Sequence, residues 1–115
     1  MAKILVIDDS EDMRDFFSTV LNMYGYEVKT AFSLNGELTS FKPDLILLEV
    51  MSKDTDGRKI CKEIKTKNQD KNIPILLLST TAALLKDYEQ CGADDILEKP
   101  FSIYTLIEKI NTLLK

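Results

Sequence analysis

Two uninterrupted apolar runs restrict the fold of this chain most strongly, "DLILL" at residues 44–48 and "IPILLLS" at residues 73–79. Neither run shows the alternation of apolar and polar residues that is typical of a strand with one wet face. We therefore expect both to be strands that are buried on both sides. Strands of this kind belong to parallel sheets covered by helices on both faces, so the runs predict an α/β fold.

The rest of the sequence alternates strictly between short strands and helices. Further strands are predicted at residues 3–8, 26–30 and 95–97. Helices are predicted where apolar residues recur at helical spacing, at about residues 13–21, 34–41, 60–64, 82–91 and 103–113, with Gly25 and Gly92 as helix stops and Ser102 as an N-cap. The pattern is β-α repeated five times. We expect one domain over residues 1–115, with a five-stranded parallel sheet, right-handed crossovers and helices on both faces.

Composition excludes several classes of function. The chain has 115 residues, a net charge of −4 and no histidine. The negative charge disfavours direct binding of nucleic acid. No apolar run is long enough for a membrane span, and no signal peptide is recognisable, so we expect a cytoplasmic protein. Without histidine the usual general base is missing, and we expect no enzyme. Cys61 and Cys91 are expected to be reduced thiols on helices.

Polar side chains follow four of the five predicted strands. In chain order they are Asp8 and Asp9, Glu49, Ser79 and Thr80, then Lys99 with Pro100. The carboxyl ends of parallel strands meet at one edge of the sheet, so these residues are expected to converge. Each has an ordinary explanation when taken singly, for example as a helix cap or a surface lysine. Together they form an oxygen-rich cluster, which suits Mg²⁺.

The motifs "ILVIDDS", "PDLILLEV", "DG", "IPILLLST" and "GADDILEKPF" resemble those of response-regulator receiver domains in two-component signalling, over the whole length of the chain. The resemblance implies a flavodoxin-like fold with strand order 2-1-3-4-5. It implies a Mg²⁺ site made by Asp8, Asp9, Glu49 and the backbone carbonyl of Met51. It also implies phosphoryl-contacting roles for Ser79, Thr80 and Lys99, a cis bond before Pro100, and a protein partner such as a histidine kinase, an output domain or another signalling protein.

Glu49 departs from the family because it stands where the phosphate-accepting aspartate is expected. Its extra methylene displaces the carboxyl group by roughly 1.5 Å. A misplacement of about 1 Å can cost on the order of 10²-fold in positioned chemistry. We therefore predict that Glu49 is not phosphorylated efficiently and that Mg²⁺ binding is weakened or dispensable. A glutamate supplies one charge and two oxygens, against about −1.5 to −2 charge and three oxygens for a phosphoryl group, so we expect partial mimicry of phosphorylation.

Two further departures concern signal transmission. Thr80 is larger than the alanine or glycine usual in the family, and Ile96 replaces an aromatic residue whose rotation reports phosphorylation. By family analogy the interaction face comprises the fourth helix, the fifth strand and the fifth helix. Its candidate residues are Leu84, Leu85, Ile96 and Tyr104. Each leucine could equally face the core, whereas Tyr104 is expected at the surface.

The leading interpretation is an atypical receiver domain, or pseudo-receiver, that acts through protein–protein contacts without a phosphorylation cycle. The alternative is a working phosphoacceptor regulator, either with slow phosphorylation of Glu49 or with an engineered change from aspartate. A third interpretation is a flavin- or nucleotide-binding enzyme on the same fold. It requires a phosphate-cradling loop after the first strand. The acidic sequence "DDSEDM" at that place opposes it.

Overall fold

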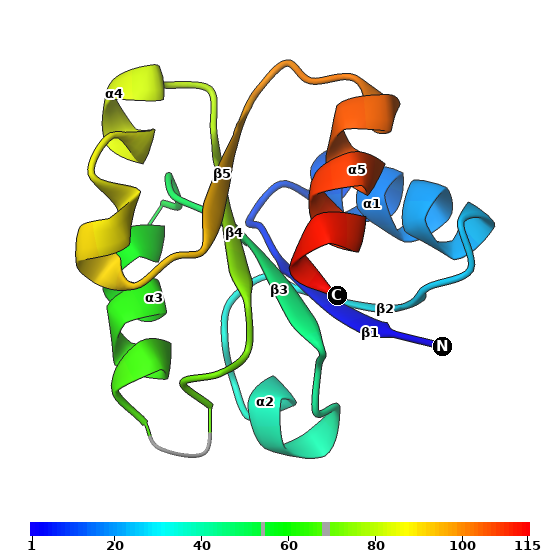
Figure 1. Ribbon diagram of the computed structural model, residues 1–115, viewed down its shortest axis with the longest axis horizontal. Helices are drawn as coiled ribbons and strands as arrows, with labels where there is room; N and C mark the ends of the chain where they lie inside the picture. Colours follow the sequence, from blue (N-terminus) through cyan, green and yellow to red (C-terminus); the bar gives the residue numbers. More distant parts are fainter. Residues whose placement is uncertain (54, 68–69) are drawn as a thin grey trace.

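The computed structural model describes residues 1–53, 55–67 and 70–115. Asp54, in the acidic loop after the third strand, lies outside the described residues. The strands are β1 (Lys3–Ile7), β2 (Glu27–Ala31), β3 (Leu45–Glu49), β4 (Ile75–Ser79) and β5 (Asp95–Glu98). They form one parallel sheet in the order β2-β1-β3-β4-β5 (Figure 1). This confirms the α/β fold and strand order expected from the sequence.

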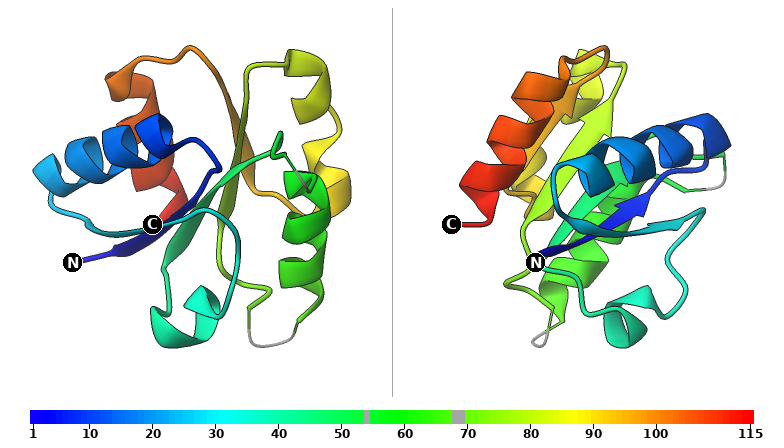
Figure 2. Two further views of the ribbon diagram at one scale, coloured as in Figure 1. Left: turned by 180° about the vertical axis from the view of Figure 1, so that it is seen from behind. Right: turned by 90° about the vertical axis from the view of Figure 1, so that its right-hand side faces the viewer.

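Helices cover both faces of the sheet, as predicted (Figures 1 and 2). One face carries α1 (Glu11–Met23) and α5 (Ile103–Leu113), and the other carries α2 (Glu37–Ser40), α3 (Gly57–Thr66), α4 (Ala82–Leu85) and the 3₁₀ helix η1 (Tyr88–Cys91). The Ser102 hydroxyl caps α5 by accepting a hydrogen bond from the backbone N–H of Thr105, as expected. Gly25 follows α1 with a φ of +90°, which suits a glycine stop.

The two apolar runs, residues 44–48 and 73–79, form β3 and β4 at the centre of the sheet and are buried on both sides. Alternate residues of β3 and β4 point to opposite faces. Leu45, Leu47, Leu76 and Leu78 pack with Phe17, Leu21, Leu106 and Ile110 of α1 and α5. Ile46, Leu48, Ile75 and Leu77 pack with Cys61 and Ile64 of α3. The core thus has two layers, and its central strands hold the carboxyl edge rigid.

The helical prediction was wrong in two places. The single helix expected at residues 82–91 is divided into α4 and η1, because Lys86 is extended and Asp87 adopts a left-handed conformation with φ of 57°. Aspartate tolerates this conformation better than most residues. The weak helix expected at residues 34–41 is confined to α2, which begins after Gly36 at φ of +87°. In the described part of the chain, no helix is long and apolar enough to cross a membrane.

Candidate functional site

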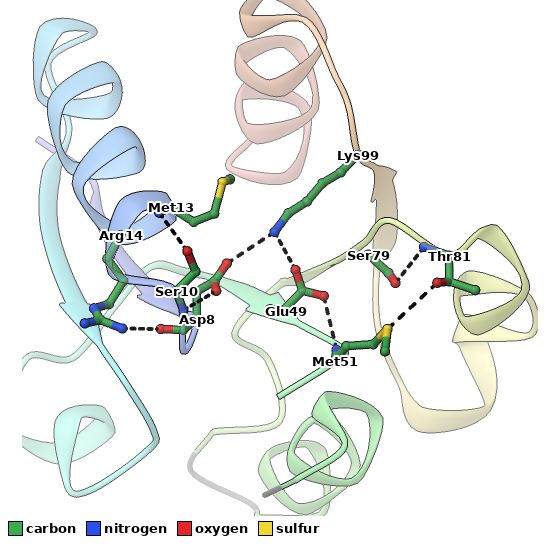
Figure 3. Close-up of polar contacts among 9 residues, drawn as sticks. All are labelled: Asp8, Ser10, Met13, Arg14, Glu49, Met51, Ser79, Thr81 and Lys99. Atoms are coloured by element: carbon green, nitrogen blue, oxygen red, sulfur yellow. Dashed lines mark hydrogen bonds and ion pairs between the residues drawn. The ribbon is translucent and has the colours of Figure 1, made fainter. Parts of the chain in front are cut away.

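A lysine shared by two carboxylates occupies the centre of the carboxyl edge (Figure 3). Lys99 follows β5 directly, and its bond to Pro100 is cis, as predicted. Its Nζ lies 3.3 Å from Oδ2 of Asp8, at the end of β1, and donates a hydrogen bond to Oε1 of Glu49, at the end of β3. The three side chains are only 12%, 4% and 9% exposed, respectively. We call Asp8, Glu49 and Lys99 the ionic centre.

Every carboxylate oxygen of the ionic centre has a donor. Oδ1 of Asp8 accepts the N–H of Ser10 at 2.9 Å, and Oε2 of Glu49 accepts the N–H of Met51 at 3.1 Å. A buried ionic group is tolerated only when its charge is paired and its remaining lone pairs are satisfied. The ionic centre meets this condition, although its two carboxylates and one ammonium leave a formal charge of −1.

Asp9 lines one small hollow together with Asp8 and Glu49 of the ionic centre. Its Oδ2 accepts the backbone N–H of Lys53 at 2.9 Å, which ties the β1–α1 loop to the loop after β3. Asp8, Asp9 and Glu49 are of the oxygen-donor type that Mg²⁺ prefers. Nevertheless, residues 1–53, 55–67 and 70–115 contain no group of three or more potential ligand side chains placed to hold a metal ion. In this geometry the carboxylates are engaged by protein donors and do not fit a ready-made Mg²⁺ site.

The hydroxyl residues after β4 form a separate group, which we call the hydroxyl loop (Ser79, Thr80 and Thr81). Ser79 is completely buried, and its Oγ accepts the N–H of Thr81 at 3.0 Å. Thr80 is exposed. The Thr81 hydroxyl lies 3.8 Å from Sδ of Met51, in the loop after β3 (Figure 3). The backbone N–H of Lys99 donates to the carbonyl of Ser79 at 2.8 Å, whereas the Lys99 side chain contacts Asp8 and Glu49. Asp8, Glu49 and Lys99 are therefore joined through their side chains, and Asp9 lines the same hollow as Asp8 and Glu49. The Ser79 side chain lies at the same edge but is bonded within its own loop.

The loop after β3 is held against the strand end by Gly57. The N–H of Gly57 donates to the carbonyl of Val50 at 2.7 Å. A Cβ on Gly57 would lie 2.3 Å from the backbone oxygen of Glu49, which no real side chain permits. Asp56 caps α3 by accepting the N–H of Arg58, and the Arg58 guanidinium lowers the pKa of the Asp56 carboxyl chiefly through a side-chain hydrogen bond. The "DG" motif thus fixes the start of α3 beside the ionic centre.

Sequence reasoning missed Arg14. Its guanidinium donates to the backbone carbonyl of Asp8 at 2.8 Å and lies 5.8 Å from the ring centroid of Phe32. It therefore braces the end of β1 without neutralising the Asp8 carboxylate. The only signal in the sequence was a basic residue in the turn after the acidic pair, which by itself is an ordinary surface position.

The residues proposed for an interaction face differ in exposure. Tyr104 is 70% exposed, as predicted. Leu84 and Ile96 are partly buried against the core. Leu85 is 2% exposed and belongs to the core, so its assignment to the interaction face was wrong. The four-residue α4 turns this leucine toward the sheet.

Comparison with known proteins agrees with the fold and identifies the family. The response regulator receiver domain family matches residues 4–111, and the chain belongs to this family. The DNA-binding dual master transcriptional regulator RpaA of Synechocystis sp. is 34% identical over 121 residues, which cover 100% of this chain and 50% of that protein. The probable transcriptional regulator ycf27 of Cyanophora paradoxa is 37% identical, covering 98% of this chain and 48% of that protein.

Among solved structures, the chemotaxis protein CheY4 of Vibrio cholerae has a TM-score of 0.89 at 33% identity, covering 99% of both chains. The chain spans about half the length of the curated relatives it matches. Together these similarities identify a receiver domain of two-component response regulators.

Proposed function

We propose that this receiver domain acts through protein–protein contacts without a phosphorylation cycle, and that Glu49 serves as a built-in, partial substitute for a phosphoryl group. The ion pair between Glu49 and Lys99 carries the proposal. In the family resemblance, Lys99 matches the lysine that pairs with the phosphoryl group. Here a carboxylate already holds this lysine.

The surroundings of Glu49 oppose phosphorylation. Both of its oxygens are engaged, one by Lys99 and one by the N–H of Met51. A phosphoryl donor would have to displace Lys99 from Glu49 and bring further negative charge next to Asp8. The ionic centre is already at −1, so the electrostatic cost is not offset by an unused cation within it.

Mimicry of phosphorylation is partial because the hydroxyl loop does not take part. A phosphoryl group offers three acceptor oxygens and nearly two negative charges. The two oxygens of Glu49 accept hydrogen bonds from Lys99 and from the N–H of Met51, and the Ser79 hydroxyl is not among the partners of Glu49. The Ser79 hydroxyl remains with Thr81. We propose that the domain is held in one signalling state, in which Lys99 is paired with Glu49 and the Ser79 hydroxyl is not bonded to Glu49.

Intact-mass analysis after incubation with acetyl phosphate and Mg²⁺ tests the proposal, with Glu49→Asp run alongside. We expect no phosphoryl mass on the natural chain and a phosphoryl mass on the Glu49→Asp variant. A Glu49→Gln variant serves as the matched control for labelling elsewhere. Phosphorylation of the natural chain at Glu49 would contradict the proposal and establish the alternative, a slow phosphoacceptor switch.

Mg²⁺ binding is proposed to be weak in the natural chain, because each candidate carboxylate has a protein donor. Calorimetric titration with Mg²⁺ should give tighter binding for Glu49→Asp than for the natural chain, since the shorter side chain reaches less far toward Lys99. Equal affinities would show that Glu49 does not limit the metal site.

The proposed contact surface comprises β5 and α5 with Leu84, Ile96 and Tyr104, and the proposed partner is an output domain, a histidine kinase or another signalling protein. Tyr104 is its best-exposed member. Tyr104→Ala is expected to weaken partner capture with little loss of stability. Met23 is the last residue of α1 and is 78% exposed, and Met23→Ala should leave capture unchanged. Equal capture by both variants would remove this surface from the proposal.

A further inference from the structure

Cys61 and Cys91 are distant in the sequence but lie together where α3 meets η1. The Sγ of Cys61 lies 3.4 Å from the backbone carbonyl of Cys91, and the Cys91 thiol donates to the carbonyl of Tyr88 at 3.1 Å. Both cysteines are free thiols. Burial, followed by a hydrogen bond with the Cys91 thiol, raises the pKa of Cys61. The two side chains are therefore neighbours, and one of them is wholly buried.

Cys91 differs from Cys61 because it reaches a surface hollow. It is partly exposed, whereas Cys61 is completely buried. The hollow lies between α3 and the α4–η1 segment. Cys91 lines it together with four basic residues and one acidic residue, namely Arg58, Lys59, Lys62, Lys86 and Asp87. Although the chain has a net charge of −4, the hollow around Cys91 is lined mainly by basic residues. Of the two thiols, Cys91 is the one that solvent can reach. Such a hollow attracts small anions.

We propose that Cys91 is a thiol–disulfide exchange site for a small acidic disulfide of the glutathione class, and that Cys61 is its resolving thiol. In the first step the Cys91 thiolate attacks one sulfur of the disulfide. A mixed disulfide forms on Cys91, and one small thiolate leaves. In the second step the Cys61 sulfur attacks Sγ of Cys91, and the Cys61 proton passes to the departing small thiolate, which leaves as the second thiol. Two electrons pass from the two cysteines to the small disulfide, which becomes two thiols.

Burial assigns the order of the two steps. Only a thiol that meets solvent can attack a dissolved disulfide, and this describes Cys91. Cys61 is shielded from the reagent but adjoins Cys91, which is the position of a resolving group. The product would join α3 covalently to η1, next to α4 on the same face of the sheet (Figure 2). Oxidation would therefore restrain the segment that leads from α4 into β5.

The test is incubation of the folded chain with glutathione disulfide, followed by alkylation and intact-mass analysis without reductant. The natural chain should lose the mass of two hydrogen atoms, and digestion should yield a peptide linked through Cys61 and Cys91. The Cys61→Ala variant should stop at the mixed disulfide and keep one glutathionyl group on Cys91. Cys91→Ser should remain unmodified while folded.

Several outcomes would overturn the proposal. One is an unmodified natural chain that reacts only after denaturation. A stable glutathionyl adduct on the natural chain, equal to that of Cys61→Ala, would remove the resolving role of Cys61. To test the hollow, Lys62→Glu/Lys86→Glu should react roughly tenfold more slowly with glutathione disulfide but at an unchanged rate with neutral hydroxyethyl disulfide. Equal slowing with both reagents would refute recognition of the acidic disulfide.

Discussion

The two halves of the carboxyl edge are organised differently although they belong to the same sheet. On one side, the ionic centre joins the ends of β1, β3 and β5 through Lys99, and its side chains are nearly buried. On the other side, the Ser79 hydroxyl of the hydroxyl loop accepts the N–H of Thr81, and Thr81 contacts Met51 in the loop after β3. The first half is joined across the sheet by charged side chains, whereas the side chains of the second half make neutral contacts with its own backbone and with the neighbouring loop.

Under the proposed function, the ionic centre is the half that receives a signal and the hydroxyl loop is the half that transmits it. Glu49 supplies a negative group to Lys99 in the first half. In the second half, the Ser79 hydroxyl is bonded to Thr81. We infer that the two halves are energetically independent in the natural chain, and the predictions below measure this independence.

The largest expected effect is from Lys99→Met, which removes the cation and leaves two nearly buried carboxylates without it. Breaking a buried pair in this way costs about 3–5 kcal/mol of unfolding free energy. Denaturant unfolding measures the loss. The control is Lys109→Met, whose pair with Asp95 is about one-third exposed and should contribute under about 1 kcal/mol. Similar losses for the two variants would show that the ionic centre is an ordinary surface pair.

Gly57→Ala should be the next most damaging, because the new Cβ would meet the backbone of Glu49 and Val50 at 2.3 and 2.9 Å. Overpacking of this kind costs roughly 1–3 kcal/mol. Gly36→Ala is the matched control, since it has the strain of a left-handed backbone but no atom within 4 Å of its Cβ. Its cost is expected near 1 kcal/mol. Denaturant unfolding measures both losses of unfolding free energy. A larger loss for Gly36→Ala than for Gly57→Ala would show that the close backbone approach at Gly57 is not what holds the loop after β3 in place.

Double-mutant cycles test the independence of the two halves directly. Glu49→Gln combined with Lys99→Met should give a coupling energy above about 1 kcal/mol, because the two side chains are in contact. Glu49→Gln combined with Ser79→Ala should give under about 0.5 kcal/mol, because their side chains have different partners. Strong coupling between Glu49 and Ser79, measured by unfolding, would mean that the transmitting half responds to Glu49 after all.

The sequence revealed the ionic centre more reliably than the hydroxyl loop, for a physical reason. Asp8, Glu49 and Lys99 converge because parallel strands end at a common edge, and strands are readable from apolar runs. The partners of Asp9 and Ser79 are backbone N–H groups of Lys53 and Thr81, chosen by loop conformations that no periodicity encodes.

The same limit explains the errors around α4. The break at Asp87 depends on one left-handed residue, and helical spacing alone does not reveal it. Leu85, at the end of α4, is buried against the sheet, and helical spacing alone does not show which face of so short a helix meets the core. Tyr104 was placed correctly at the surface because residues such as Leu106 were assigned to the inner face of α5, although Ile103, assigned to the same face, is 39% exposed.

The smallest effect is expected at Asp56, on the exposed rim beside the ionic centre. Its hydrogen bond with Arg58 lowers the pKa of the folded-state carboxyl below its ordinary value. A lowered folded-state pKa stabilises the fold above the unfolded-state pKa of about 3.9, and this stabilisation disappears as the pH falls through the folded-state pKa. Solvent screening limits it to a few tenths of a kcal/mol, since the pair is over one-third exposed.

Asp56→Asn preserves a capping side chain but cannot titrate. Its unfolding free energy should therefore be slightly below that of the natural chain at pH 7, and the difference should be smaller in urea titrations at a pH below the unfolded-state pKa of about 3.9. Arg58→Gln removes the charged partner of Asp56. Its unfolding free energy should show the same pH-dependent difference from the natural chain. A deficit that is the same at both pH values would locate the effect in helix capping, and charge pairing on the rim would then contribute nothing measurable beside the ionic centre.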